Sequence, residues 1–115
     1  MSMKVVETTV FTRQVAALVG DEQKQMLLDE LIARPEAGAV IKAGGGLRKL
    51  RWPAHGRGKR GGIRVIYYWY ADKIMYLLLA YPKNKKDDLS FTELAVLRGV
   101  VGKEKQSWTK NSSAN

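Results

Sequence analysis

The stretch Ile63–Tyr81, IRVIYYWYADKIMYLLLAY, decides the fold of this 115-residue chain. Its two apolar runs, Ile63–Tyr70 and Ile74–Tyr81, are rich in the β-branched and aromatic residues that favour strands. Only Ala71–Lys73 separates them, a connection typical of a tight antiparallel turn. Because both runs are apolar at odd and even positions alike, both faces of each predicted strand are apolar and favour burial. We therefore predict two central strands of a sheet.

Two further strands are predicted upstream. At Gly44–Gly46 a glycine-rich break changes the apolar period from about 3.6 to about 2, and Leu47–Trp52 then reads as a strand. Residues 53–62 are polar and rich in glycine, which predicts an exposed loop at a hairpin tip. At the start of the chain, Lys4–Phe11 alternates loosely and is rich in Val and Thr, so we expect an opening strand there.

Two helices are predicted between the opening strand and the glycine-rich break. The first begins after Thr12 as its N-cap and ends at Gly20. The second is capped by Asp21 and ends before Pro35, since proline disfavours helix at the preceding residue. Apolar residues recur at helical spacing in both segments: Phe11, Val15, Leu18 and Val19, then Met26, Leu27, Leu31 and Ile32. This pattern predicts a helical hairpin packed on one face of the sheet.

A third helix is predicted after the last strand, because Ser90 and Glu93 have the spacing of a capping box. Residues 103–115 are polar and unpatterned, which predicts a frayed tail after a single domain over residues 1–102. The predicted class is α+β. We expect a small, twisted, antiparallel sheet of about four strands with a mixed edge, the hairpin on one face, and a C-terminal helix.

Composition excludes several classes of protein. The chain has no cysteine and one histidine, which rules out a disulfide framework and thiolate metal sites, so we expect no metal and no cofactor. Its longest apolar run, Ile74–Tyr81, is far shorter than the ~20 residues that span a bilayer, and no secretory signal is visible. We expect a soluble cytoplasmic protein that does not bind membranes.

Nearly all of the net charge of +9 lies in one segment. Residues 41–86 hold twelve Lys or Arg and a single acid, Asp72, whereas residues 1–40 are slightly acidic and residues 87–115 are neutral. Charge focused in this way is typical of a polyanion-binding site, most often for nucleic acid. The alternative is a solvated face that keeps the chain soluble, although solubility does not require the charge to cluster.

Three cations of this segment are expected on one sheet surface or near it. Side chains alternate along a strand, so Lys49 and Arg51 point to the same face. Arg64 is the only charge in its strand and must find a partner or face a cleft. The alternative is that Arg64 forms an ion pair with Glu30 or Asp88.

A further basic cluster, Lys83, Lys85 and Lys86, follows the last strand. If it converges with the three strand cations, the resulting pocket suits phosphate, because fixed guanidinium and ammonium groups stabilise a charged phosphorane transition state. One lysine could then act as a general acid or base. Among Tyr67–Tyr70, one ring could stack on a base while the others belong to the core.

The loop Gly56–Gly61 matches the pattern GxGxxG, but it lies between two predicted strands rather than between a strand and a helix. We therefore interpret Arg57, Lys59 and Arg60 as a phosphate clamp and not as part of a dinucleotide site. The lone histidine, His55, is expected to be a surface or RNA-stacking residue. A mechanism that needs two histidines is excluded.

Three strings of the sequence together resemble the RelE-like toxins of type II toxin–antitoxin systems, and among them the HigB-type branch. They are GGLRKLRW at residues 45–52, GRGKRGGIRVIYYW at 56–69 and YLLLAYPKNKKDDLS at 76–90. The resemblance implies a metal-independent endoribonuclease that cuts translated mRNA in the ribosomal A site, through attack of a ribose 2′-hydroxyl on the adjacent phosphate. It also implies a cognate antitoxin that holds the toxin inactive.

Site residues carry over by position. The resemblance assigns catalytic roles to Lys49, Arg51, Arg64, Lys83 and Lys86, and it implies that Arg48, Arg57, Lys59, Arg60, Lys85 and His55 contact RNA or the ribosome. Two positions depart from the family pattern. Ser90 stands near where the family has a tyrosine, and Lys86 replaces an arginine, which weakens any bidentate phosphate contact.

Two other functions fit the same fold. ParE-like toxins share it and poison DNA gyrase, although they lack the cationic site; a nucleic-acid-binding module without catalysis would need only the basic segment. The partners expected are the antitoxin, the ribosome and mRNA, with operator DNA bound only through the antitoxin. The antitoxin either covers the basic cleft or sterically blocks access to the ribosome, and the sequence does not choose between these.

Overall fold

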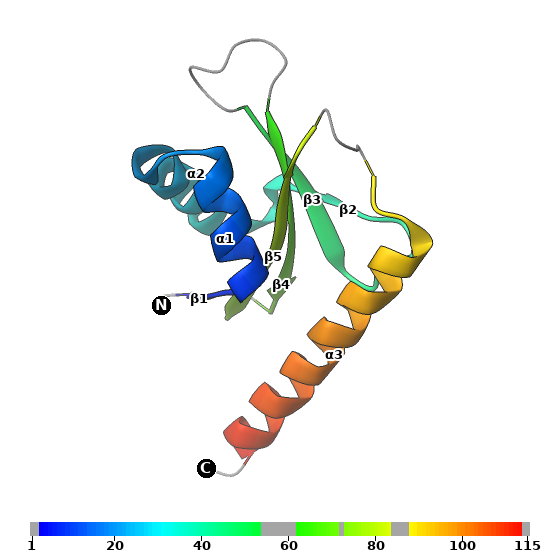
Figure 1. The fold of residues 1–115 in the computed structure, drawn as a ribbon. Helices are drawn as coiled ribbons and strands as arrows, with labels where there is room; N and C mark the ends of the chain where they lie inside the picture. Colours follow the sequence, from blue (N-terminus) through cyan, green and yellow to red (C-terminus); the bar gives the residue numbers. More distant parts are fainter. Residues whose placement is uncertain (1–2, 54–61, 72, 84–87, 114–115) are drawn as a thin grey trace.

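The computed structural model describes residues 3–53, 62–71, 73–83 and 88–113. It contains a five-stranded sheet in the order β1-β5-β4-β3-β2, in which β1 runs parallel to β5 and the other pairs are antiparallel. The strands are β1 (Lys4–Glu7), β2 (Ala39–Val40), β3 (Leu47–Trp52), β4 (Ile63–Tyr70) and β5 (Ile74–Pro82). This confirms the α+β class with an antiparallel sheet and a mixed edge (Figure 1).

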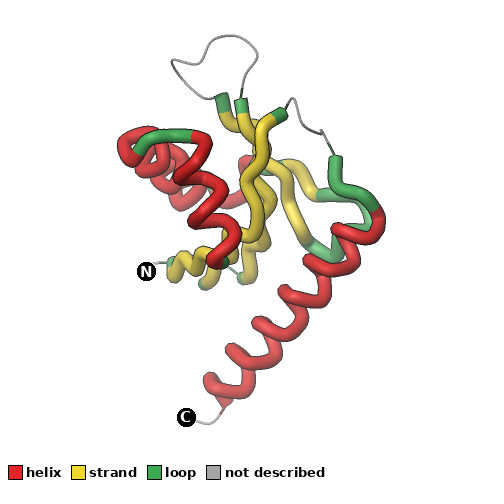
Figure 2. The backbone as a smooth tube through the Cα atoms, in the orientation of Figure 1, coloured by secondary structure: helices red, strands yellow, loops and turns green. Residues whose placement is uncertain are grey.

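Helices cover both faces of the sheet (Figures 1 and 2). α1 (Thr9–Leu18) and α2 (Asp21–Ala33) lie on one face, followed by a 3-10 turn, η1 (Pro35–Ala37), and α3 (Phe91–Ser113) packs on the other. Covering both faces explains why β4 and β5 are apolar on both sides, and both strands are central as predicted. α3 continues through most of residues 103–115, where the sequence showed no helical period.

The core is split by the sheet into two clusters, because alternate side chains of each strand point to opposite faces. Phe11, Leu27 and Leu31 of the hairpin pack against Val65, Tyr67 and Leu77 of the sheet. On the other face, Leu94, Leu97 and Val101 of α3 pack against Leu47, Ile66 and Leu78. A register shift between Ile66 and Tyr67 marks an irregularity in the β4–β5 pairing.

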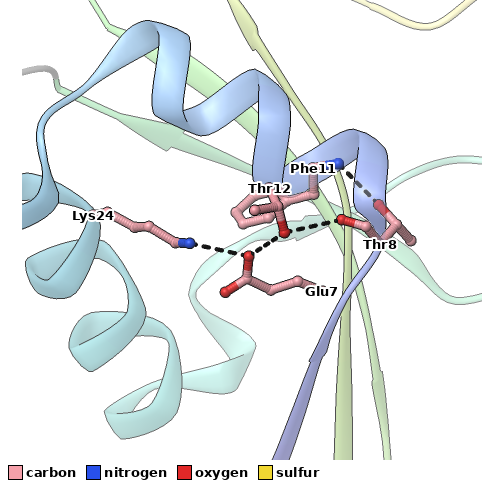
Figure 3. Close-up of polar contacts among 5 residues, drawn as sticks. All are labelled: Glu7, Thr8, Phe11, Thr12 and Lys24. Atoms are coloured by element: carbon pink, nitrogen blue, oxygen red, sulfur yellow. Dashed lines mark hydrogen bonds and ion pairs between the residues drawn. The ribbon is translucent and has the colours of Figure 1, made fainter.

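The predicted start of the first helix is wrong by one turn. The strand stops at Glu7, and Thr8 rather than Thr12 is the N-cap, because its Oγ1 accepts a hydrogen bond from the Phe11 amide at 3.0 Å. The Thr8 hydroxyl also donates to the Leu78 carbonyl at 3.0 Å, which fixes the cap to β5. Thr12 instead donates to Glu7 Oε1 at 2.6 Å, and Lys24 of α2 pairs with the same oxygen at 3.0 Å (Figure 3).

Two other local predictions also differ from the structure. Gly20 is the N-cap of α2, and Asp21 lies in the first turn, where a carboxylate stabilises the positive end of the helix. The strand β2 was not predicted, because two residues are too short to show a period. It exists because the preceding segment is anchored to the sheet.

That anchor is Tyr67, whose hydroxyl accepts a hydrogen bond from the Gly38 amide at 2.8 Å and donates to the Pro35 carbonyl at 2.6 Å. A Cβ at position 38 would lie 2.7 Å from the Tyr67 ring, so only glycine allows this approach. Arg48 adds a second anchor, donating to the Gly38 carbonyl at 2.7 Å while its guanidinium lies 5.6 Å from the centre of the Trp69 ring. Together they place β2 beside β3.

We expect Tyr67→Phe to lower the free energy of unfolding by about 1–3 kcal/mol, since it leaves the buried Gly38 amide and the partly buried Pro35 carbonyl without their partner. Urea titration at pH 8 measures this directly. An unchanged free energy of unfolding at pH 8 would contradict the proposed role of Tyr67 as an anchor of this segment.

The same pair of proteins tests a pH dependence. Burial raises the pKa of the Tyr67 hydroxyl above its ordinary value of 10.0, and the hydrogen bond from the Gly38 amide offsets only part of this. The Tyr67 hydroxyl therefore contributes its full stabilisation below pH 10. This contribution is lost as the pH rises further, because tyrosine in the unfolded chain ionises at a lower pH than Tyr67 in the folded protein. The stability difference between wild type and Tyr67→Phe should narrow above pH 10. Burial also raises the pKa of Tyr76, but that effect is common to both proteins.

Candidate active site

Three predicted cations lie on the face of the sheet that α3 partly covers. Arg51 on β3 and Arg64 on β4 are direct neighbours in the register, and Lys49 is paired with Ile66 one step away on the same face. Arg64 is only 5 % exposed, whereas Arg51 is exposed to solvent. The strand pairing thus places two guanidinium-bearing residues side by side, one held in the protein and one open to a ligand.

A tyrosine that sequence reasoning did not assign to the site flanks these arginines. Tyr81 on β5 is the register partner of Arg64 on its other side, and it is 6 % exposed. Its place could be inferred only from the β4–β5 register, which the sequence does not give. Lys83 lies two residues further on, and its amide donates to the Gly62 carbonyl at 3.3 Å, so this exposed lysine lies at the same end of the sheet as Arg64.

The acids considered as partners for Arg64 pair with other cations. Asp88 contacts Lys49, with 2.5 Å between Oδ1 and Nζ, and its side chain is largely exposed while that of Lys49 is not. Glu30 pairs with Arg34 at 3.1 Å on α2, which packs on the opposite face of the sheet. Among the described residues, the carboxylate of Asp88 thus lies at the edge of the cationic face, in contact with Lys49.

A groove of about 350 Å³ adjoins this face between β2 and the start of α3. Its lining comprises Ala39, Val40, Ile41 and Lys42 on one side, Asp88, Leu89, Phe91 and Leu94 on the other, and Lys49 and Ile66 between them. Phe91 is 90 % exposed. It is the first residue of α3, held by the predicted capping box, in which the Glu93 amide donates to Ser90 Oγ at 3.1 Å and the Ser90 amide to Glu93 Oε1 at 2.9 Å.

Of the remaining predicted site residues, the structure describes only Arg48. Arg48 lies on the opposite side of β3, where its hydrogen bonds to the Glu36 and Gly38 carbonyls give it a structural role. The others, namely His55, Arg57, Lys59, Arg60, Lys85 and Lys86, lie outside the described residues. Within the described ranges, no three His, Cys, Asp or Glu side chains gather to hold a metal ion, and no helix is long and apolar enough to cross a membrane.

The chemistry of the described site is that of an anion receptor. Arginine stays charged at any physiological pH and offers a planar fork of donors to phosphate oxygens. The backbone positions of two arginines and a lysine on one sheet surface are fixed, because the strands that carry them are hydrogen-bonded to each other. Cations gathered in this way before a ligand binds can stabilise a negative charge that develops in a transition state.

Comparison with known protein families agrees with the fold. The family model described as the RelE toxin of the RelE/RelB toxin–antitoxin system matches residues 3–112. The match includes all five strands and nearly the whole of α3. The chain therefore belongs to the RelE toxin family and is the toxin component of a toxin–antitoxin system.

Proposed function

We propose that this toxin is a ribosome-dependent, metal-independent endoribonuclease that cuts translated mRNA in the ribosomal A site. The observation that carries the proposal is the register pairing of Arg51 with Arg64, beside Lys49, on the face of the sheet that α3 partly covers. RelE family membership supports the reaction class. The HigB-type branch, the cytoplasmic location, and the ribosome and mRNA as partners belong to the same proposal.

In the proposed reaction, the ribose 2′-oxygen forms a bond to the adjacent phosphorus, and the bond from phosphorus to the 5′-oxygen of the next nucleotide breaks. A base takes the 2′-hydroxyl proton, and an acid gives one to the leaving 5′-oxygen. Arg64 and Arg51 hold the phosphate oxygens as negative charge develops on them. Lys83 and Lys86, after β5, are proposed to contribute to charge stabilisation or proton transfer.

Asp88 has a defined part in this proposal. Its carboxylate contacts Lys49 Nζ, where a phosphate oxygen of the RNA would form an equivalent charge-assisted bond. Substrate binding therefore requires Asp88 to release Lys49. Because the Asp88 side chain is 79 % exposed, water can solvate it after release, and the exchange costs little.

The proposal predicts cleavage only of messages that are being translated. The chain is induced in cells together with two copies of one transcript, of which one lacks a start codon, and 5′ ends are mapped on both. We expect new 5′ ends within the reading frame of the translated copy and none on the other. The antitoxin, co-expressed, should abolish the cuts.

Other outcomes would separate the remaining interpretations. Cuts on both copies would contradict ribosome dependence. No cuts on either copy, with growth still arrested, would favour gyrase poisoning or RNA binding without catalysis, and gyrase-linked DNA breaks would then distinguish these two.

A further inference from the structure

We propose that Gln14 of α1 is a positioning residue of the cationic site, although α1 covers the opposite face of the sheet. Gln14 holds a bulge in β5, and this bulge turns Tyr81 to the face that carries Arg64. The inference rests on the proposed function, because it takes the face around Arg64 to be the place where RNA is cut.

The bulge lies in the middle of the β4–β5 pairing. On one side of it Ile66 pairs with Leu79, and on the other side Tyr67 pairs with Leu77, so Leu78 has no partner of its own on β4. One extra residue in a strand reverses the alternation of its side chains from that point on. Leu78 and Leu79 accordingly both pack into the core cluster under α3, whereas the side chains of β4 alternate without a break.

The bulge decides which residue of β5 lies beside Arg64. Beyond it, Tyr81 belongs to the cluster under α3, and Ala80 belongs to the cluster under the helical hairpin. If β5 alternated regularly from Leu77, these two residues would exchange faces. Because of the bulge, Arg64 is flanked by Arg51 on β3 and by Tyr81 on β5.

Two side chains of the first helix bond to the main chain on either side of Leu79. The hydroxyl of Thr8, the N-cap of α1, donates to the Leu78 carbonyl at 3.0 Å, and Gln14 Oε1 accepts from the Ala80 amide at 2.8 Å. The pairing of β1 with β5 ends before this point, so the glutamine supplies an acceptor where no strand does. Gln14 therefore holds β5 at the residue before Tyr81.

The Ala80 amide depends on this acceptor. Ala80 is only 1 % exposed, and a main-chain amide that is removed from water needs a hydrogen-bond partner. Without the oxygen of Gln14, β5 must change its main-chain path to find another acceptor, and this change occurs next to Tyr81. Thr8 is less suitable for a test, because it also caps α1 through the Phe11 amide.

A shift of Tyr81 would be transmitted to Arg64. The two residues are 6 % and 5 % exposed, and in a close-packed region neither side chain can move far without the other. A displacement of about 1 Å in a group that contacts the reacting atoms can lower a rate on the order of 10²-fold. We therefore expect Gln14 to affect the rate of cleavage more than the affinity for the message.

The test uses the full-length toxin and single-turnover cleavage of a message on purified ribosomes, over a range of toxin concentrations. Gln14→Leu removes the acceptor at similar size, and we expect the maximal rate per folded molecule to fall about tenfold or more while the half-saturating concentration stays nearly unchanged. Gln14→Asn, which is milder for folding, should show the same loss because its shorter side chain withdraws the oxygen. Gln14→Glu keeps an oxygen at the same place and should retain most of the rate.

Gln25→Leu provides the matched control, because it makes the same chemical change at an exposed position of α2 that bonds only to Asp29 on its own helix. It should behave as wild type. An undiminished rate in Gln14→Leu, or equal losses in Gln14→Leu and Gln14→Glu, would overturn the positioning role.

A double-mutant cycle tests whether Gln14 acts through Tyr81. Tyr81→Leu should itself lower the rate, and Gln14→Leu should add little in that background, because the side chain that it positions is already absent. Fully additive effects of the two substitutions would contradict the proposed coupling.

A spectroscopic measurement separates this inference from the nuclease proposal. In toxin labelled with fluorotyrosine, the fluorine resonance of Tyr81 is assigned by its loss in Tyr81→Phe. It should shift in Gln14→Leu and stay in place in Gln14→Glu, while the resonance of Tyr70, at the far end of β4, stays constant in both. An unmoved Tyr81 resonance in Gln14→Leu would overturn the positioning role, whereas absence of cleavage by the wild-type chain would overturn the proposed function.

Discussion

Replacing Arg64 with alanine should lower mRNA cleavage by a factor on the order of 10² or more and abolish growth arrest, because a fixed cation facing the transition state is lost. Ribosome binding should stay mostly intact, since the exposed cations of the same segment remain. The measurements are cleavage of a translated message in a purified system and co-sedimentation with ribosomes. If the chain is a binding module without catalysis, neither the wild-type protein nor Arg64→Ala should cleave the message, and the substitution should lower the affinity only modestly.

The burial of Arg64 requires a control for folding. Arg64→Lys keeps the charge but not the fork of donors, so it should recover only part of the cleavage that Arg64→Ala loses. Arg13→Ala removes an exposed arginine of α1 and should leave both unchanged. If Arg64→Ala unfolds at the wild-type temperature and still cuts at the wild-type rate, the proposed role of Arg64 is wrong.

Phe11→Ala should lower the free energy of unfolding by about 3–5 kcal/mol, the range for removing a large buried side chain. Phe11 is 0 % exposed and lies between α1 and the sheet, in the cluster on the face opposite the arginines. Its loss opens a cavity that α1 cannot fill, because the Thr8 cap fixes the start of that helix on β5. Thermal or urea unfolding measures the effect.

The adjacent residue gives a matched control. Val10→Ala on the same helix turn removes a side chain that is 47 % exposed, and it should change stability by less than about 1 kcal/mol. Because Phe11 is remote from the cationic face, the folded fraction of Phe11→Ala should cut at the wild-type rate. A reduced rate per folded molecule would show that the two faces of the sheet are coupled.

Strong local patterns in the sequence predicted most of the architecture. The two-sided apolar runs of β4 and β5 required a sheet covered on both faces, and the capping box at Ser90 and Glu93 marked the start of α3. The alternation along β3 placed Lys49 and Arg51 on one face. These features depend on side-chain periodicity, which a sequence displays directly.

Features that depend on contacts between distant residues could not be predicted. Thr8 caps α1 because β5 supplies a second bond to its hydroxyl, and β2 forms because Tyr67 holds Gly38. Tyr81 joins the arginines through the β4–β5 register, and the groove at Phe91 arises where α3 crosses the sheet near β2. To predict each of these features, one must know which segments contact each other, and the local sequence pattern does not contain that information.

The parallel pairing of β1 with β5 has a consequence for the synthesis of the chain. Lys4 is aligned with Ile74, and Thr8 bonds to Leu78 across 70 residues, so the first strand has no place to dock until β5 has been made. Contacts of such long sequence separation form late and slowly. A nascent chain therefore cannot complete its sheet until β5 has left the ribosome, although β1 is the first strand to be made.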